Sequence, residues 1–88
     1  MEHTKEWCVY ILKCGDGTLY NGMTDDFEHR LAAHRAGKGA KYTRGRGPLE
    51  PVYREPCEDR SAALRREAAV KKLSRTKKLE LISGKPGV

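Results

Sequence analysis

The sequence predicts an α+β domain in which a small three-stranded antiparallel sheet is flanked by helices, in the order β-β-α-β-α-α. Two observations support this fold class. Two short apolar, β-prone runs at residues 7–14 and 19–23 are separated by turn residues, and the composition becomes strongly helical from Asp59 onward. At 88 residues the chain is long enough for one core only. We therefore expect one domain at residues 7–82, with loose termini at residues 1–6 and 83–88.

The first two strands are expected to form a hairpin around Gly15-Asp16-Gly17. With this three-residue loop, Leu12 faces Tyr20, and Tyr10 faces Gly22, so the two tyrosines share one face as diagonal neighbours. Gly22 then leaves space beside Tyr10. A two-residue loop would shift the register by one and place the tyrosines on opposite faces, so the inference depends on the turn.

The first helix is predicted at residues 25–36. Thr24 supplies a capping hydroxyl, the acidic residues after it suit the first turn, and Gly37 is typical of a helix end.

Two side-chain stripes follow from the spacing along this helix. Phe27 and Leu31 lie four residues apart and form the buried stripe. Arg30 and His34 form an adjoining stripe at the edge of the core, where we expect them to face a cleft.

The rest of the chain alternates a loop, an edge strand and two helices. Residues 38–48 are glycine-rich and basic, which predicts a surface loop with a short helical turn near residues 40–43. Residues 49–55 form the third strand, and Pro51 places that strand at a sheet edge, so the first strand is central. Helices are predicted at residues 61–73 and 76–82, with a break near Ser74.

Charge and composition narrow the classes of partner. Eighteen Lys plus Arg against 12 Asp plus Glu give a net charge of +6 and a pI near 9.4, which favours nucleic acid first and an anionic membrane surface second. No apolar run approaches the roughly 18 residues that span a bilayer, and the first six residues are polar, so we expect a cytoplasmic protein that does not enter a membrane. The three cysteines show no CxxC or Cys/His spacing, which favours reduced thiols over disulfides or a zinc site.

Several short motifs, taken in order, resemble the GIY-YIG nuclease superfamily, in particular its small stand-alone bacterial members. They are Cys8-Val9-Tyr10, Tyr20-Asn21-Gly22, Arg30 ten residues after Tyr20, His34, the run from Gly39 to Gly45, and Glu67. The resemblance extends over residues 7–82. The sequence departs from the family pattern at Cys8 in place of glycine, at Val9 and Asn21 in place of isoleucine, and at Met23 where some relatives carry a lysine.

The resemblance implies a catalytic set of Tyr10, Tyr20, Arg30, His34 and Glu67. Glu67 resembles the family's metal ligand and would hold one Mg²⁺ or Mn²⁺ weakly until a substrate phosphate joins it. Arg30 offers a charged fork for a phosphate oxygen. Either tyrosine is a candidate to activate water, and the sequence does not distinguish them. His34 either orients substrate or shuttles a proton, or it has no fixed role. The alternative for Glu67 is a structural carboxylate paired with Lys71 or an arginine.

A second set of residues is expected to contact nucleic acid through the sugar-phosphate backbone. It consists of Arg35, Lys38, Lys41, Tyr42, Arg44, Arg46 and Lys71. Tyr42 either lines the phosphate site or packs the loop onto the sheet, and the lysines and arginines are equally consistent with a solvated basic surface.

The leading hypothesis is a metal-dependent endonuclease that cuts DNA, with DNA favoured over RNA and with a protein partner as a possible source of specificity. The alternative is a DNA- or RNA-binding module on the same fold, an accessory to repair with negligible cleavage activity. The enzyme hypothesis predicts that Tyr10, Tyr20, Arg30 and Glu67 converge on one concave face, on the side of the sheet where the helices pack.

Overall fold

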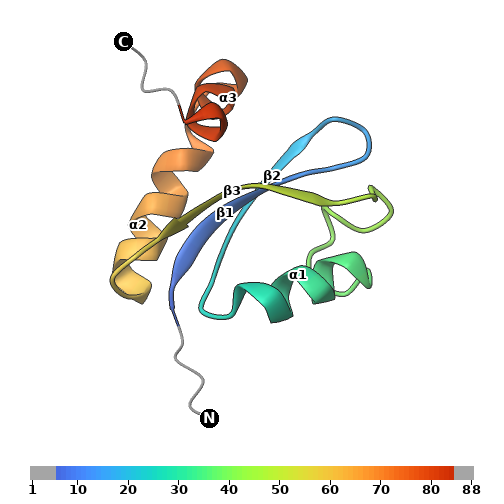
Figure 1. Cartoon of the computed structure of the whole chain (residues 1–88), viewed down its shortest axis with the longest axis horizontal. Coiled ribbons are helices and arrows are strands. Elements are labelled where there is room, and N and C mark those ends of the chain that lie inside the picture. Colours follow the sequence, from blue (N-terminus) through green and yellow to red (C-terminus); the bar gives the residue numbers. More distant parts are fainter. Residues whose placement is uncertain (1–5, 85–88) are drawn as a thin grey trace.

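The computed structural model describes residues 6–84, and the element order is the predicted one. The expected loose ends at residues 1–5 and 85–88 lie outside the described residues. The elements are the strands β1 (Cys8–Lys13), β2 (Leu19–Thr24) and β3 (Glu50–Pro56), and the helices α1 (Phe27–Arg35), α2 (Arg60–Lys71) and α3 (Arg75–Ser83). Figure 1 shows α1 on one side of the sheet, whereas α2 crosses the sheet on the other side and leads into α3.

The sheet is antiparallel with the order β2-β1-β3, which confirms that β1 is central and that the strand containing Pro51 lies at an edge. The register of the hairpin is also as predicted, because Leu12 pairs with Tyr20 and Tyr10 pairs with Gly22. Gly17 supplies the left-handed position of the turn, with φ of 87°. The two tyrosines therefore emerge from the same face of the sheet.

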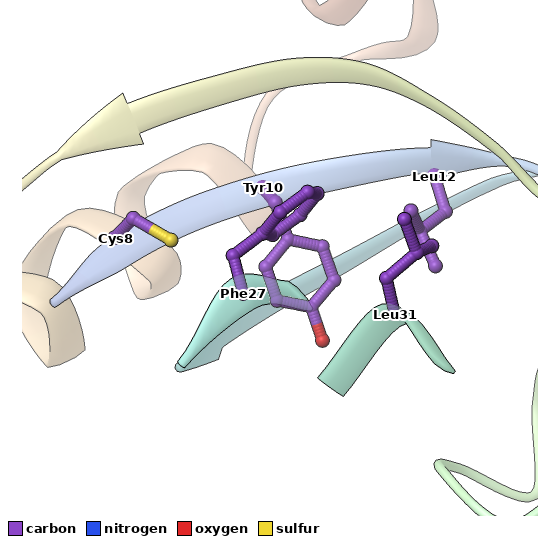
Figure 2. Packing of buried hydrophobic residues seen from close by; sticks show 5 residues of the cluster. All are labelled: Cys8, Tyr10, Leu12, Phe27 and Leu31. Atoms are coloured by element: carbon purple, nitrogen blue, oxygen red, sulfur yellow. The ribbon is translucent and has the colours of Figure 1, made fainter. Parts of the chain in front are cut away.

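Alternation along β1 divides the core between the two faces of the sheet. Cys8, Tyr10 and Leu12 pack against Phe27 and Leu31 of α1, and Figure 2 shows these side chains pointing toward one another across the gap between strand and helix.

The opposite face of β1 packs against the C-terminal helices. Val9 and Ile11 are fully buried against Ala63 and Val70 of α2, and partly buried side chains from β2, β3 and α3 complete this cluster. The prediction that the helices carrying Arg30 and Glu67 pack on one side of the sheet is therefore wrong. The side chains of α1 pack on the face of β1 that carries Tyr10, whereas those of α2 pack on the face that carries Val9 and Ile11.

The helix ends differ from the predicted ones by one or two residues. Asp26 caps α1 by accepting a hydrogen bond from the His29 backbone, and the Thr24 hydroxyl accepts from the Asp26 backbone at 3.0 Å, so Thr24 supports the cap without being it. Ser74 caps α3, and Gly84, with φ of 73°, ends it. The last turn of α3 thus includes Ser83, which corrects the expectation of a loose terminus from residue 83 onward. None of the helices within residues 6–84 is long and apolar enough to cross a membrane.

The loop after α1 is fastened to the β1–β2 turn. The Gly15 backbone N–H donates to the Arg46 carbonyl at 2.6 Å, and the Arg46 guanidinium forms an ion pair with Asp16 at 2.5 Å. At the base of the loop, Arg35 donates to the Leu49 carbonyl. The glycine-rich segment is thereby held beside the hairpin, over the end of the sheet face that carries the tyrosines.

Candidate active site

A chain of hydrogen bonds connects β1, α1 and the loop through three buried side chains. The Tyr10 hydroxyl lies 2.8 Å from Nε2 of His34, and Nδ1 of His34 lies 2.9 Å from the Thr43 hydroxyl. Thr43 donates its own proton to the Ala40 carbonyl at 3.1 Å, so its oxygen must accept from Nδ1–H of His34. In the neutral ring, Nε2 then carries no proton and Tyr10 is the donor to it. These bonds therefore select the Nδ1–H tautomer of neutral His34.

Two glycines make room for this chain. A Cβ at Gly22 would lie 2.3 Å from the Tyr10 hydroxyl, and a Cβ at Gly39 would lie 2.4 Å from Nδ1 of His34. Real carbon atoms do not approach so closely, so only glycine fits at either position without displacing a ring. Thr43 and Gly39 are further functional candidates, and the motif that contains them indicates no individual role for either. Their significance becomes visible only when the loop folds over His34.

Burial shifts the pKa of both titratable groups in the chain toward the neutral form. Desolvation raises the pKa of Tyr10 to about 12, and a hydrogen bond and the charge of Arg30 only partly oppose that rise. Desolvation, followed by the positive charge of Arg30, lowers the pKa of His34 below its usual range. His34 is 1% exposed, which corrects the expectation that it lies at the edge of the core. It borders a hollow of about 300 Å³ whose other walls include Thr43 and loop glycines.

Tyr20 lies between His34 and the loop and is only partly buried. Its ring is 5.3 Å from the His34 ring and is stacked on Tyr42 at 5.6 Å. The Arg46 guanidinium lies 4.5 Å from the centre of the Tyr42 ring, so Tyr42 packs the loop onto the sheet, one of the two alternatives left open for it. Tyr10, Tyr20, Arg30 and His34 thus occupy one neighbourhood on the α1 face.

Glu67 is placed differently, because α2 covers the opposite face of the sheet. Its helix neighbours Ala63 and Val70 are fully buried, so Glu67 lies on the stripe that α2 turns toward the sheet. Its side chain is 19% exposed, and its carboxylate forms an ion pair with Lys71 at 3.8 Å. Within the described part of the chain, no hydrogen bond or ion pair joins Glu67 to the tyrosines, Arg30 or His34. Its helix does pack on β2, the edge strand that carries Tyr20.

Asn21 of β2 is a further residue of interest that is not among the predicted site residues. It pairs with Ile11 across the β1–β2 ladder, so its side chain lies on the α2 face of the sheet. The residue is 5% exposed, and neither its amide nitrogen nor its carbonyl oxygen has a hydrogen-bond partner in residues 6–84. Buried polar groups are ordinarily paired, which makes this amide an anomaly beneath α2. The signal in the sequence was the departure from isoleucine within the second motif.

The residues expected to bind nucleic acid fall into two groups. Lys38, Lys41 and Arg44 are exposed on the loop. The others have intramolecular partners, which are Leu49 for Arg35, Asp16 for Arg46, Tyr20 for Tyr42 and Glu67 for Lys71. The first group is therefore available to a polyanion, whereas the second stabilises the loop and α2.

Comparison with known proteins agrees with the motifs and the fold. The family model of the GIY-YIG catalytic domain matches residues 6–80. A UPF0213 protein of Clostridium perfringens is 56% identical over 77 residues, covering 88% of this chain and 83% of the relative, and one of Natronomonas pharaonis is 52% identical over 79 residues, covering 90% and 93%. The solution structure of a UPF0213 protein from Bacillus halodurans is 49% identical with a TM-score of 0.60, covering 93% of this chain and 87% of that one.

The chain belongs to the GIY-YIG family, whose domain is of the nuclease type and implies interaction with nucleic acid. Its relatives of similar length are the UPF0213 proteins, a name that records no activity.

Proposed function

We propose that the protein is a divalent-metal-dependent endonuclease that hydrolyses phosphodiester bonds in DNA. The observation that carries the proposal is the α1-face cluster, in which a partly exposed phenol, Tyr20, adjoins the buried Tyr10–His34–Thr43 chain and the cation Arg30. Hydrolysis of a phosphodiester requires an activated water, a cation to offset charge on the phosphate, and stabilisation of the departing oxygen. The cluster supplies a candidate for the first two requirements.

The positions of the two phenols favour Tyr20 as the one that meets water and substrate. Tyr10 is 1% exposed and donates its proton to His34, and burial raises its pKa to about 12. Its role is to fix the His34 ring, against which Tyr20 packs. Tyr20 is the candidate general base for the attacking water. Arg30 then contacts a phosphate oxygen, because its guanidinium is permanently charged.

The residues present fit a weakly held divalent ion. In the described residues no group of three His, Cys, Asp or Glu side chains is arranged to hold a metal, so a dedicated cage is absent there. Glu67 supplies one hard carboxylate oxygen, and substrate phosphate would supply others, as Mg²⁺ sites at phosphates commonly do. A bound ion would supply charge stabilisation for the departing oxygen. Glu67 is the residue that would hold this ion, either Mg²⁺ or Mn²⁺.

A second function is favoured by the separation of Glu67 from the tyrosines. If the Glu67–Lys71 pair is only structural, the domain binds DNA or RNA without efficient cleavage and acts as an accessory to other proteins.

Substitution of Glu67 distinguishes the two functions. Glu67→Gln keeps the shape of the side chain and removes its charge, and Glu80→Gln is a matched control, since Glu80 is paired with Lys77 at 3.6 Å on the neighbouring helix. Cleavage of labelled single-stranded, duplex, flap and junction substrates is measured with Mg²⁺ or Mn²⁺ and again with a chelator. We expect Glu67→Gln to lower cleavage by about 100-fold or more, with nucleic-acid affinity unchanged or tighter. Glu80→Gln should cleave as the wild type does.

Intact cleavage by Glu67→Gln would rule out its role as metal ligand. A wild type that binds these substrates but cuts none of them would establish the binding module. Melting temperatures of both variants show whether any loss of activity is only a loss of folded protein.

A further inference from the structure

An open groove of about 210 Å³ lies between the hairpin, the loop and α3. Three segments that are distant in sequence form its walls. They contribute Thr18 and Leu19 where β2 begins, Tyr42 from the loop, and Arg75 and Lys78 from α3. The lining combines a hydroxyl, an aromatic ring and two cations, and none of the described residues that line it is acidic.

The groove adjoins the α1-face cluster. Leu19 immediately precedes Tyr20, and Tyr42 is stacked on Tyr20 with the ring centres 5.6 Å apart. Tyr42 thus lies between Tyr20 and the rest of the groove, so the groove is within reach of a strand whose phosphate lies at Tyr20.

Within residues 6–84, neither cation of the groove has an acidic partner. Arg75 donates to the Gly17 carbonyl at 3.1 Å, a bond that fixes the guanidinium beside the hairpin and leaves its charge uncompensated. Lys78 is partly buried, and no carboxylate in residues 6–84 forms an ion pair with it, whereas Lys71 and Lys77 are paired with Glu67 and Glu80. A partly buried ammonium without a counter-ion costs free energy that a bound anion would recover.

We propose that this groove binds the backbone phosphate of a nucleotide next to the scissile one, with Lys78 and Arg75 as its contacts. The inference rests on the proposed function and deepens it. It assigns a direction to the bound strand, which runs from Tyr20 across Tyr42 to α3. It also gives α3 a role in binding that the composition of this basic helix did not distinguish from a solvated surface.

The test compares Lys78→Ala with Lys72→Ala, which removes the same charge from an exposed lysine at the end of α2 that does not line the groove. Affinity for a labelled single strand and a labelled duplex is measured over a series of salt concentrations, with a chelator present so that no substrate is cut. We expect Lys78→Ala to weaken binding about 3- to 10-fold and to reduce the slope of log Kd against log salt by about 0.7 for the single strand and 0.9 for the duplex. Lys72→Ala should change the slope by clearly less. Equal effects of the two variants would overturn the proposal, since binding would then follow net charge alone.

A second measurement tests the direction of the strand. Cleavage by the wild type and by Lys78→Ala is compared on substrates shortened by single nucleotides on one side of the cut and then on the other. We expect the difference between the two proteins to disappear when nucleotides are removed from one side only. A difference that survives shortening on both sides would also overturn the proposal. Both results are distinct from failure of the proposed function, which is decided by Glu67→Gln and by whether the wild type cuts at all.

Discussion

The two faces of the sheet differ in whether their buried polar side chains are hydrogen-bonded. On the α1 face, Tyr10, His34 and Thr43 are all buried, and each forms at least one hydrogen bond within the chain of donors and acceptors. On the α2 face, the cluster around Val9 and Ile11 is apolar, yet the Asn21 amide beneath α2 has no partner within the described residues.

This difference affects how firmly the polar side chains on each face are held. A fully satisfied polar network holds its rings in one arrangement, because any displacement leaves a buried donor or acceptor unpaired. The α1 face is thus a fixed platform for Tyr20. On the α2 face, Glu67 belongs to no such network within residues 6–84, and its carboxylate forms an ion pair with Lys71 at 3.8 Å.

The largest expected effect comes from crowding the α1 face with Gly22→Ala. The added methyl group would overlap the end of Tyr10, whose ring is fixed by an edge-on contact with Phe27 at 5.5 Å and by its bond to His34. We expect a loss of about 1–3 kcal/mol of stability, measured by denaturant unfolding. A double-mutant cycle with Tyr10→Leu, which removes the overlapped atoms, should recover most of that loss. An equal cost of Gly22→Ala in both backgrounds would show that Tyr10 is not the group displaced.

The second prediction concerns the pH dependence that the α1 network imposes. The pKa of His34 is lowered in the folded protein, so the unfolded chain takes up a proton first as the pH falls. The contribution of His34 to stability is therefore complete above its unfolded pKa of about 6.5 and is lost as the pH falls through the lower folded value.

We expect the free energy of unfolding of the wild type to decrease as the pH is lowered through this window, and His34→Gln to flatten that decrease. His29→Gln is the matched control, since His29 is exposed on the same helix. Denaturant titrations at a series of pH values measure the effect. Parallel pH profiles for the wild type and His34→Gln would contradict the assignment.

The smallest expected effects are changes in the free energy of unfolding caused by two substitutions on β2, one on each face of the sheet, and they should have opposite signs. Asn21→Val removes an unpaired buried amide at a strand position that favours β-branched residues, so we expect a gain of about 1 kcal/mol. Thr24→Val on the same strand removes a hydroxyl that accepts from the Asp26 backbone, so we expect a loss of about 1 kcal/mol. Both are measured by denaturant unfolding. Destabilisation by Asn21→Val would show that the Asn21 amide has a hydrogen-bond partner in solution. A parallel loss of cleavage would associate the Asn21 amide with Glu67.

The sequence by itself determined the order of the elements and the register of the hairpin. Turn chemistry at Gly15-Asp16-Gly17 and the two-residue period of the strands are local properties, and with a three-residue loop they place Tyr10 and Tyr20 on one face, as observed. Pro51 likewise identified an edge strand, because a missing donor excludes it from the centre of a sheet. The spacing of the motifs identified the family, which the match over residues 6–80 confirms.

Only the tertiary structure decided which face each helix covers and which polar groups meet. The connection after β3 carries α2 to the side opposite α1, which separates Glu67 from Arg30, and no local pattern specifies that path. The burial of His34 and its bond to Thr43 depend on a loop that folds back over α1, and Gly39 permits that approach. Such contacts join residues nine or more positions apart. Their energies depend on packing and desolvation in the folded protein, and local sequence patterns do not specify these.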